Sequence, residues 1–385
     1  MSTRNINVHV YPSTFEFETR ILKVTATLVA RELVDEVLVV AKAGAGLPKE
    51  AWIDERRRVV RVGAWLQGEE FWAKALRFIE WSVRVLWRLR RERVSMVNCH
   101  SLSVLPLCVA IKWLHCAILV YEPHELESET ATFTGWRRRL VKWVEHILIG
   151  QASRVIVVSD SISRHYQQDY GLAEVSVIMN VPESMQGMGH GGNDVLRSHF
   201  GIPDGHLVFM YQGALEEERG VLLLMRAFQQ VPVDRHLVFM GFGSLTAAIK
   251  SAAETYPNLH LYPAVPPDKV IHYTRGADIG FALLYEDCEN HRCALPNKLF
   301  HYLHAGLPVI VSDLPEMGAL VDRYACGWRV RNTEVNIAER VAAVNASDRV
   351  AAAHGAICAR AELHWDNEAD KLEAIYRDLL AEPVT

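Results

Sequence analysis

Short runs of β-branched and aliphatic residues alternate with longer amphipathic segments along almost the whole chain of 385 residues. That alternation predicts parallel sheets covered by helices, because two parallel neighbouring strands need a long crossover between them. The rhythm breaks at residues 182–193, PESMQGMGHGGN, which are rich in Gly and Met and show no period. We therefore expect two doubly wound α/β domains joined by an exposed strap, with a ligand cleft between the carboxyl ends of their strands.

The expected elements follow this rhythm in both halves. In the first half we predict strands over residues 6–11, 36–41, 58–62, 96–99, 117–121, 154–158 and 175–178, and helices over 19–32, 70–91, 136–149 and 161–170. In the second half we predict strands over 208–212, 236–240, 259–262, 279–284 and 308–312, and helices over 221–230, 245–256, 267–275, 296–305 and 367–380. We expect an N-terminal domain over residues 1–183, completed by the C-terminal helix 366–385, and a second domain over 184–365.

The composition narrows the class of protein. Half of the residues are apolar and 23% are charged, which excludes a disordered or fibrous chain. A net charge of −5 gives no general attraction to nucleic acid. Seven cysteines without a C-x-x-C pair indicate a reducing compartment, and the first residues lack the basic-then-apolar pattern of a secretory signal. We expect a cytoplasmic protein. The most apolar stretch, 103–121, is interrupted by Pro106, Lys112 and His115 and makes a poor membrane span.

The segment LPNKLFHYLHAGLPVIVSD, residues 295–313, is the most specific in the chain. Pro296 suits the start of a helix and Gly306 suits its end. A helix N-terminus attracts anions, and Lys298 adds a full positive charge there, so the segment suits a phosphate or diphosphate. An ordinary buried αβ unit, in which Asn297 caps the helix, is the alternative.

Two glycine-containing turns precede this segment. Gly213 follows an expected strand and leads to Glu218 and Arg219, and the next expected strand is followed by Gly241 and Gly243. One such turn is a weak signal, but three turns at successive strand ends of one sheet predict a diphosphate ligand. We expect backbone N–H groups, Arg219 and Lys298 to hold it.

Together these motifs resemble the retaining glycosyltransferases of family 4, which have the GT-B fold. The resemblance rests on the G…ERG turn, the GFG turn, ADIGFALL and PNKLF-x-YL-x-AGLPVIVSD in the second half, and on YEPHELESE, RVIVVSDSI and YGL…VIMNVPE in the first. It implies two Rossmann-like domains facing a central cleft. The C-terminal domain would bind a nucleoside-diphosphate sugar, most often UDP-linked, and the N-terminal domain a glycan or lipid-linked acceptor. Neither a divalent metal nor another cofactor is implied.

The resemblance also assigns roles to residues. The donor-binding residues would be Gly213, Glu218, Arg219, Gly241, Gly243, Pro296, Asn297, Lys298 and His301. His124 would lie beside the transferring anomeric carbon, with Glu122 and Glu125 as its carboxylate neighbours in the catalytic group.

The chain departs from the family pattern at the paired glutamates, where it has Cys293 and His301. A neutral His301 nitrogen can accept a hydrogen bond from a donor hydroxyl, whereas Cys293 cannot replace a carboxylate. The first strand is followed by residues 12–17, PSTFEF, in place of the family's double glycine, and Ala214 stands where arginine is common.

Two other functions stay open at this point. A sugar-nucleotide epimerase could use the same architecture, but would need carboxylates placed for proton transfer at the sugar. A non-catalytic homologue that binds nucleotide would explain the missing glutamates.

Eight tryptophans lie in the first 150 residues, several of them beside arginines in the expected helices 70–91 and 136–149. Such helices either bind anionic lipid, which would place the protein on the inner face of a membrane near a lipid-linked acceptor, or are buried helices with a basic edge. The loop 287–293, DCENHRC, superficially resembles a metal site. All its potential ligands fall in one short loop, so we expect no metal there.

Overall fold

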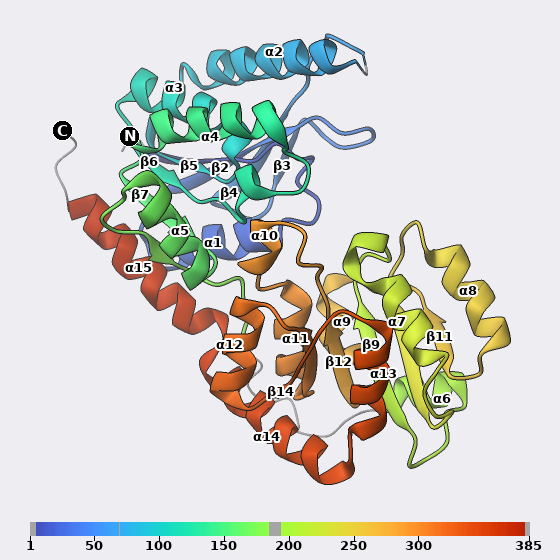
Figure 1. The fold of residues 1–385 in the computed structure, drawn as a ribbon. Coiled ribbons are helices and arrows are strands. Elements are labelled where there is room, and N and C mark those ends of the chain that lie inside the picture. The colour runs from blue at the N-terminus through green and yellow to red at the C-terminus, as the bar shows by residue number, and fades with distance from the viewer. Residues whose placement is uncertain (1–4, 69, 185–193, 382–385) are drawn as a thin grey trace. The chain divides into compact units, whose positions relative to one another are not determined.

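The computed structural model describes residues 5–68, 70–184 and 194–381 (Figure 1). The chain divides into two units. Unit 1 comprises the residues up to Met179 together with those from Glu368 onward, and unit 2 runs from Asn180 to Asn367. From residue 185 onward, the expected strap at 182–193 lies outside the described residues.

Unit 1 is built on a sheet whose order is β3-β4-β2-β1-β5-β6-β7-β8 among the described residues. Its strands are β1 (Ile6–Val10), β2 (Glu36–Lys42), β3 (Glu50–Trp52), β4 (Arg57–Val62), β5 (Val94–Cys99), β6 (Ile118–Tyr121), β7 (Arg154–Val157) and β8 (Ser176–Val177). Only β3, which pairs with β4, is antiparallel to its neighbour in the described sheet. The strand order reverses between β1 and β5, so their carboxyl ends form the switch point at which open α/β sheets bind ligands.

Helices cover both faces of this sheet. They are α1 (Thr19–Ala30), α2 (Phe71–Leu89), α3 (Leu105–His115), α4 (Gly135–Ile149), α5 (Asp160–Tyr170) and α15 (Trp365–Ala381), with short turns η1 (Leu102–Val104) and η2 (Glu127–Glu129). Figure 1 shows α2, α3 and α4 on one face and α1 with α15 on the other. Right-handed crossovers decide which face each helix covers. The chain moves through the sheet in one direction when α1 leads from β1 to β2, and in the opposite direction through α2, α3 and α4, so α1 lies on the other face. None of the helices in the described part of the chain combines the length and apolar content that crossing a membrane requires.

A buried carboxylate holds α4 against the rest of unit 1. Glu145 is 1% exposed and accepts hydrogen bonds from Tyr121 (2.8 Å), Tyr166 (2.6 Å) and Tyr170 (2.5 Å). Apart from Glu145, Ile149 is the one fully buried residue of this helix. Polar bonds to β6 and α5 therefore hold α4 in place, where a typical amphipathic helix uses an apolar face.

Unit 2 contains a parallel sheet of order β11-β10-β9-β12-β13-β14 in its described residues. Its strands are β9 (Leu207–Gln212), β10 (Arg235–Met240), β11 (Leu259–Tyr262), β12 (Ile279–Ala282), β13 (Val309–Ser312) and β14 (Gly327–Val330). Its helices are α6 (Val195–Phe200), α7 (Val221–Phe228), α8 (Thr246–Thr255), α9 (Val270–Thr274), α10 (Glu289–Arg292), α11 (Asn297–Ala305), α12 (Pro315–Tyr324), α13 (Glu334–Ala343) and α14 (Ala346–Glu362), with turns η3 (Glu217–Arg219) and η4 (Pro267–Lys269). The order reverses between β9 and β12, which places the switch point of unit 2 at their carboxyl ends.

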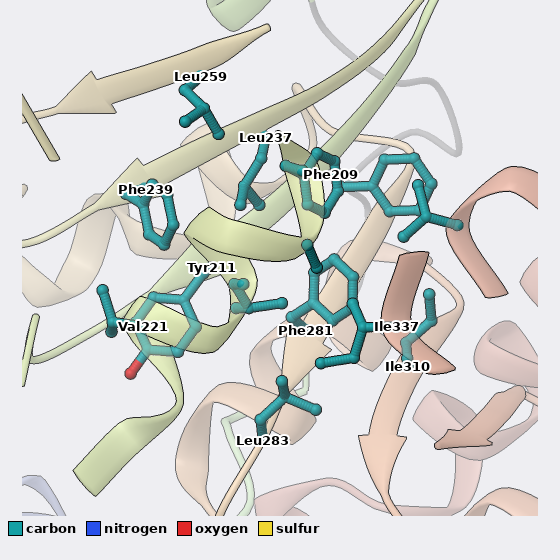
Figure 2. Packing of buried hydrophobic residues seen from close by; sticks show 14 of the residues in the cluster. Phe209, Tyr211, Val221, Leu237, Phe239, Leu259, Phe281, Leu283, Ile310 and Ile337 are labelled. Atoms are coloured by element: carbon teal, nitrogen blue, oxygen red, sulfur yellow. The ribbon is translucent and has the colours of Figure 1, made fainter. Parts of the chain in front are cut away.

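Alternate residues of the central strands build the core of unit 2. Phe209 on β9 packs edge-on to Phe228 at 5.4 Å and stacks on Phe281 at 5.8 Å, measured between ring centroids. Figure 2 shows Phe209 and Phe281 in one cluster with Tyr211, Val221 of α7 and Ile337 of α13. This core holds β9 and β12 in place, and the carboxyl ends of these two strands form the switch point of unit 2.

The predicted strands and helices correspond to observed ones with ends shifted by a few residues, including the last helix, α15. The sequence analysis did not assign β3, α3, α6, α10 or the elements between residues 315 and 362. In α14 the buried positions are Ala352, Gly355, Ala356 and Ala359. A Cβ on Gly355 would lie 2.3 Å from the carbonyl oxygen of Tyr324. These small residues let α14 pack closely against the backbone of its neighbour. Because they are only weakly hydrophobic, the sequence shows no clear helical period of apolar residues there.

We predict that Glu145→Ala lowers the free energy of unfolding of unit 1 by about 3 kcal/mol, because three buried hydroxyls lose their acceptor. Urea unfolding followed by tryptophan fluorescence measures this. The control is Glu174→Ala, which removes a carboxylate that is 71% exposed and paired with Arg154, and which should cost less than about 1 kcal/mol. Equal effects of the two variants would contradict the anchoring role of Glu145.

Candidate active site

Three histidines form a hydrogen-bonded chain at the switch point of unit 1. His9 lies near the end of β1, His100 directly follows β5, and His124 lies just after β6. Nδ1 of His9 is 2.8 Å from Nε2 of His100, and Nδ1 of His100 is 3.2 Å from Nε2 of His124. The ring of Tyr11 stacks on His124 at 5.5 Å. The predicted residue His124 is thus the outermost member of a chain that begins in the core.

A buried ion pair lies against this chain. Arg20 of α1 binds Oε1 of Glu122 through Nε (3.0 Å) and Nη2 (2.9 Å), and donates to the carbonyl oxygen of Ile178 (2.8 Å). The other oxygen of Glu122 is 3.7 Å from Nδ1 of His100. The pair therefore ties α1 to the residues that follow β6 and β8.

Burial keeps the three rings neutral. It lowers the pKa of His9 to about 3, and burial together with the Arg20 charge lowers the pKa of His124 to about 3. The pKa of His100 lies well below its usual value, first through burial and then through the neighbouring His9. Burial also raises the pKa of Glu122, an effect that the Arg20 charge opposes.

The position of Glu122 decides which ring nitrogens of the three hydrogen-bonded histidines carry the protons. A carboxylate oxygen near Nδ1 of His100 favours a proton on that nitrogen. His100 then donates to Nε2 of His124, whose own proton must lie on Nδ1. His124 would therefore present an N–H donor to a ligand, with its tautomer set by residues that the ligand does not touch.

The structure brings Glu122 and His124 together but leaves Glu125 exposed. A different carboxylate, Glu127, accepts hydrogen bonds from Oγ of Ser101 (2.7 Å) and the backbone N–H of Leu102 (2.9 Å). Burial raises the pKa of Glu127 to about 7. The sequence analysis missed His9, Arg20, His100 and Glu127. Histidines at the ends of three neighbouring parallel strands were the available signal, since those ends meet at one sheet edge.

Lys298, on the first turn of α11, is the central cation of the switch point in unit 2. Its Nζ is buried, lies 3.8 Å from the centroid of the Tyr211 ring, and has no hydrogen-bond partner among the described residues. Burial and the nearby Arg219 charge lower the pKa of this ammonium well below its usual value. A buried ammonium without an acceptor is costly, which marks the position as one where an anion would be stabilising.

Arg219 approaches the same place from the turn after β9. It lies exposed with Glu218 on η3, and its charge also acts on the hydroxyl of Tyr211. Gly220, with a φ of 73°, ends η3 and starts α7. The structure thus brings the two predicted cations, Arg219 and Lys298, close enough for the Arg219 charge to act on both Lys298 and Tyr211, while Glu218 is exposed.

The glycines of the turns after β9 and β10 allow these turns to pack against each other, and the backbone N–H groups of these glycines are not free for a ligand. The N–H of Gly213 donates to Met240, that of Gly241 to Tyr262, and that of Gly243 to Thr246, so all three N–H groups already have acceptors. A Cβ on Gly241 would lie 1.9 Å from the carbonyl oxygen of Gly213. These glycines therefore allow the turns after β9 and β10 to pack together, a steric role that the sequence analysis did not anticipate.

His301 belongs to a polar chain that starts at Thr274. The hydroxyl of Thr274 donates to Oε1 of Gln212 (2.6 Å), and Nε2 of Gln212 lies 3.2 Å from Nδ1 of His301. With Nδ1 accepting from the amide, the ring proton lies on Nε2. The arrangement favours His301 as a hydrogen-bond donor, where the sequence led us to expect an acceptor. Cys293 is buried, and burial raises the pKa of its thiol to about 12.

The start of α11 differs from the expected one. The helix begins at Asn297, with Pro296 in the capping position and no side-chain cap. The side-chain oxygen of Asn297 instead accepts a hydrogen bond from Nδ2 of Asn180 (2.9 Å). Asn297 therefore ties the helix to the segment that follows β8 and does not cap it.

The described residues contain three groups of side chains close enough to share a metal ion. Two of them include residues that the sequence analysis singled out: His100 with Glu122 and His124, and Asp287 with Cys288 and His291. In the first group Arg20 already neutralises the carboxylate, so a metal would add a second cation. In the second, Nδ1 of His291 is 2.6 Å from Asp287. Ion pairs and hydrogen bonds within the protein account for both groups.

Comparison with protein families identifies the chain. The model of glycosyltransferase family 4 matches residues 18–181, and the model of glycosyl transferases group 1 matches residues 206–346. The chain is a family 4, group 1 glycosyltransferase. Members of this retaining family use nucleotide-sugar donors, so the resemblance found in the sequence is confirmed at the level of the family.

Solved structures share the fold of this glycosyltransferase. Sucrose-phosphate synthase from Thermosynechococcus elongatus is 14% identical with a TM-score of 0.80, covering 98% of this chain and 100% of its own. HepE from Anabaena, in complex with UDP-glucose, is 14% identical with a TM-score of 0.73, covering 97% and 99%. WaaG, a glycosyltransferase involved in lipopolysaccharide biosynthesis, is 14% identical with a TM-score of 0.69, covering 96% and 99%. The expected GT-B class is confirmed. No curated protein matches the chain in a sequence comparison.

The neutral histidines predict a loss of stability in acid. Unfolded His9 binds a proton below about pH 6.5, whereas folded His9 stays neutral down to about pH 3, so stability falls as the pH drops through that window. Between about pH 7 and pH 5 this one residue should cost about 2 kcal/mol. His9→Asn should reduce the loss by that amount in urea unfolding of the full chain. An unchanged pH dependence would show that His9 is protonated in the folded state.

Proposed function

We propose that the glycosyltransferase moves a sugar from a UDP-linked donor to a hydroxyl group of a glycan or glycolipid, with retention of anomeric configuration. The observation that carries the proposal is the buried Nζ of Lys298, which lacks an acceptor at the switch point of unit 2. HepE, which shares the fold, was solved with UDP-glucose and with UDP, and this supports uridine as the base.

In this proposal unit 2 stabilises the leaving group. Lys298 and Arg219 supply positive charge to the diphosphate as the bond to the sugar breaks, and the low polarity around Tyr211 strengthens that effect. The diphosphate would also raise the pKa of Lys298, which burial and the Arg219 charge lower in the free protein.

Unit 1 supplies the histidine chain to the acceptor side of the reaction. His124 donates a hydrogen bond through Nδ1 and cannot act as a general base in that tautomer. Retention allows the departing phosphate oxygen to take the acceptor proton itself, so the reaction needs no separate base. His9, His100 and Glu122 keep the ring of His124 in position. Glu127, whose pKa is about 7, is the titratable group of this region near neutral pH.

The test of the donor site is Lys298→Met, which keeps an unbranched side chain, one atom shorter, and removes its charge. We expect UDP affinity to fall by about 1.5–3 kcal/mol, the range for charge-assisted hydrogen bonds. Isothermal titration of UDP into the wild type and the variant measures this difference. Affinity should also fall as the pH rises.

The matched control is Lys250→Met, because Lys250 is exposed on α8 and its removal should leave UDP binding unchanged. Equal affinity of wild type and Lys298→Met would place the diphosphate elsewhere. Incubation with UDP-sugars then tests the reaction. UDP release that depends on an added glycan or glycolipid supports transfer, while isomerised donor without acceptor would indicate an epimerase.

A further inference from the structure

Helix α2 presents an apolar stripe to solvent. Trp72, Leu76, Ile79, Val83 and Trp87 follow one another at intervals of three or four residues, and all are exposed. The opposite side of the same helix buries Trp81, Val85 and Leu89 against unit 1. The helix therefore has two apolar faces, of which the sheet needs only one.

Helix α4 carries a second exposed stripe. Trp136, Leu140, Trp143 and Ile147 share one face and lie in solvent, whereas the inward position is taken by the charged residue Glu145. Lys142 reinforces the inner side with bonds to Glu129 (2.8 Å) and Asp169 (2.9 Å). The usual arrangement of an amphipathic helix, apolar inside and polar outside, is reversed here.

The two stripes belong to one region. Helix α3 packs between α2 and α4, and at its end Trp113 and Leu114 are exposed (Figure 1). Trp65 precedes α2, and Glu80 of α2 holds its backbone N–H at 2.8 Å. We call these residues the aromatic face: Trp65, Trp72, Leu76, Ile79, Val83, Trp87, Trp113, Leu114, Trp136, Leu140, Trp143 and Ile147. Seven of the eight tryptophans found in the sequence of this region are exposed, which rules out the interpretation of wholly buried helices.

Basic side chains surround the aromatic face. Helix α2 contributes Lys74, Arg77, Arg84 and Arg88, and α4 contributes Arg137, Arg138 and Arg139. Of these, Arg84, Arg88 and Arg138 also form ion pairs with glutamates of the protein. Some guanidinium groups lie directly on the exposed rings, with Cζ of Arg84 4.1 Å from the centroid of Trp65 and Cζ of Arg90 3.9 Å from that of Trp87. The acidic residues on these helices, Glu80 and Glu145, are already engaged with the protein. The face thus combines indole rings with positive charge.

We infer that the aromatic face binds the surface of an anionic lipid bilayer. Tryptophan prefers the zone between headgroups and acyl chains, and arginine beside it meets the lipid phosphates. Charge complementarity favours this occupant over a second copy of the chain, because pairing two such faces would bring their arginines together. The face is also larger and more aromatic than the scattered apolar residues of an ordinary protein surface.

This inference deepens the proposed function. If unit 1 binds the acceptor, a bilayer against α2 and α4 would supply a lipid-linked one. The membrane-binding step itself requires neither Lys298 nor the histidine chain, so it can be tested apart from catalysis.

The experiment is co-sedimentation of the full chain with vesicles of phosphatidylcholine and phosphatidylglycerol, compared with phosphatidylcholine alone. We expect binding to the mixed vesicles that weakens as salt is added. Val83→Glu, on the aromatic face, should weaken binding by about tenfold or more, because it places a charge against apolar lipid. The matched control is Val350→Glu on α14, where the valine is 63% exposed against 58% for Val83. UDP titration of both variants checks that unit 2 is intact.

Absence of binding to the mixed vesicles at low salt would overturn the inference, as would equal binding by Val83→Glu and Val350→Glu. A dimer in sedimentation without lipid that dissociates in Val83→Glu would assign the face to a second copy instead. If the wild type does not bind UDP, the proposed function is refuted, but the result with vesicles still stands.

Discussion

The reversal of strand order in each sheet is the constraint on which the rest of the structure depends. Parallel strands bring all their carboxyl ends to one edge, and where the order reverses the adjoining helices go to opposite faces. The ends of β1 and β5 in unit 1, and of β9 and β12 in unit 2, lie at these places. Both polar clusters gather there, because elsewhere along the sheets helices cover the strand ends and apolar side chains fill the space.

The two clusters treat buried charge in opposite ways. In unit 1 the charge of Glu122 is neutralised by Arg20, and the neighbouring histidines remain uncharged, so the group is closed and serves to orient His124. In unit 2 the ammonium of Lys298 faces an aromatic ring and lacks a hydrogen-bond acceptor within the described residues. A cluster whose buried charges are already neutralised can position a ligand without a change in its own charge. A cluster with an unneutralised buried cation is stabilised when an anion binds to it. In the proposed function the cluster of unit 1 therefore orients a ligand, and that of unit 2 stabilises the leaving group.

In unit 1 a helix is held by buried hydrogen bonds, so its apolar residues remain exposed to solvent. Glu145 and its three tyrosines hold α4 by hydrogen bonds, which frees the apolar residues of that helix to face outward. Buried carboxylates are tolerated when several donors satisfy them. The internal polar anchor and the external aromatic face are therefore two sides of one arrangement.

The sequence alone determined the class of fold, most strand positions and the family, because hydrophobic period and local motifs depend on neighbours along the chain. It also predicted Arg219 and Lys298 as the cations of the donor site. It also singled out His124 and the tryptophan-rich helices. Only the tertiary structure decided which groups meet. Arg20, His9 and His100 join Glu122 through strand order, Gln212 directs the proton of His301, and Gly241 is required by a carbonyl from another turn. Such contacts between distant segments follow from how the strands are ordered and packed, and no spacing in the sequence specifies them.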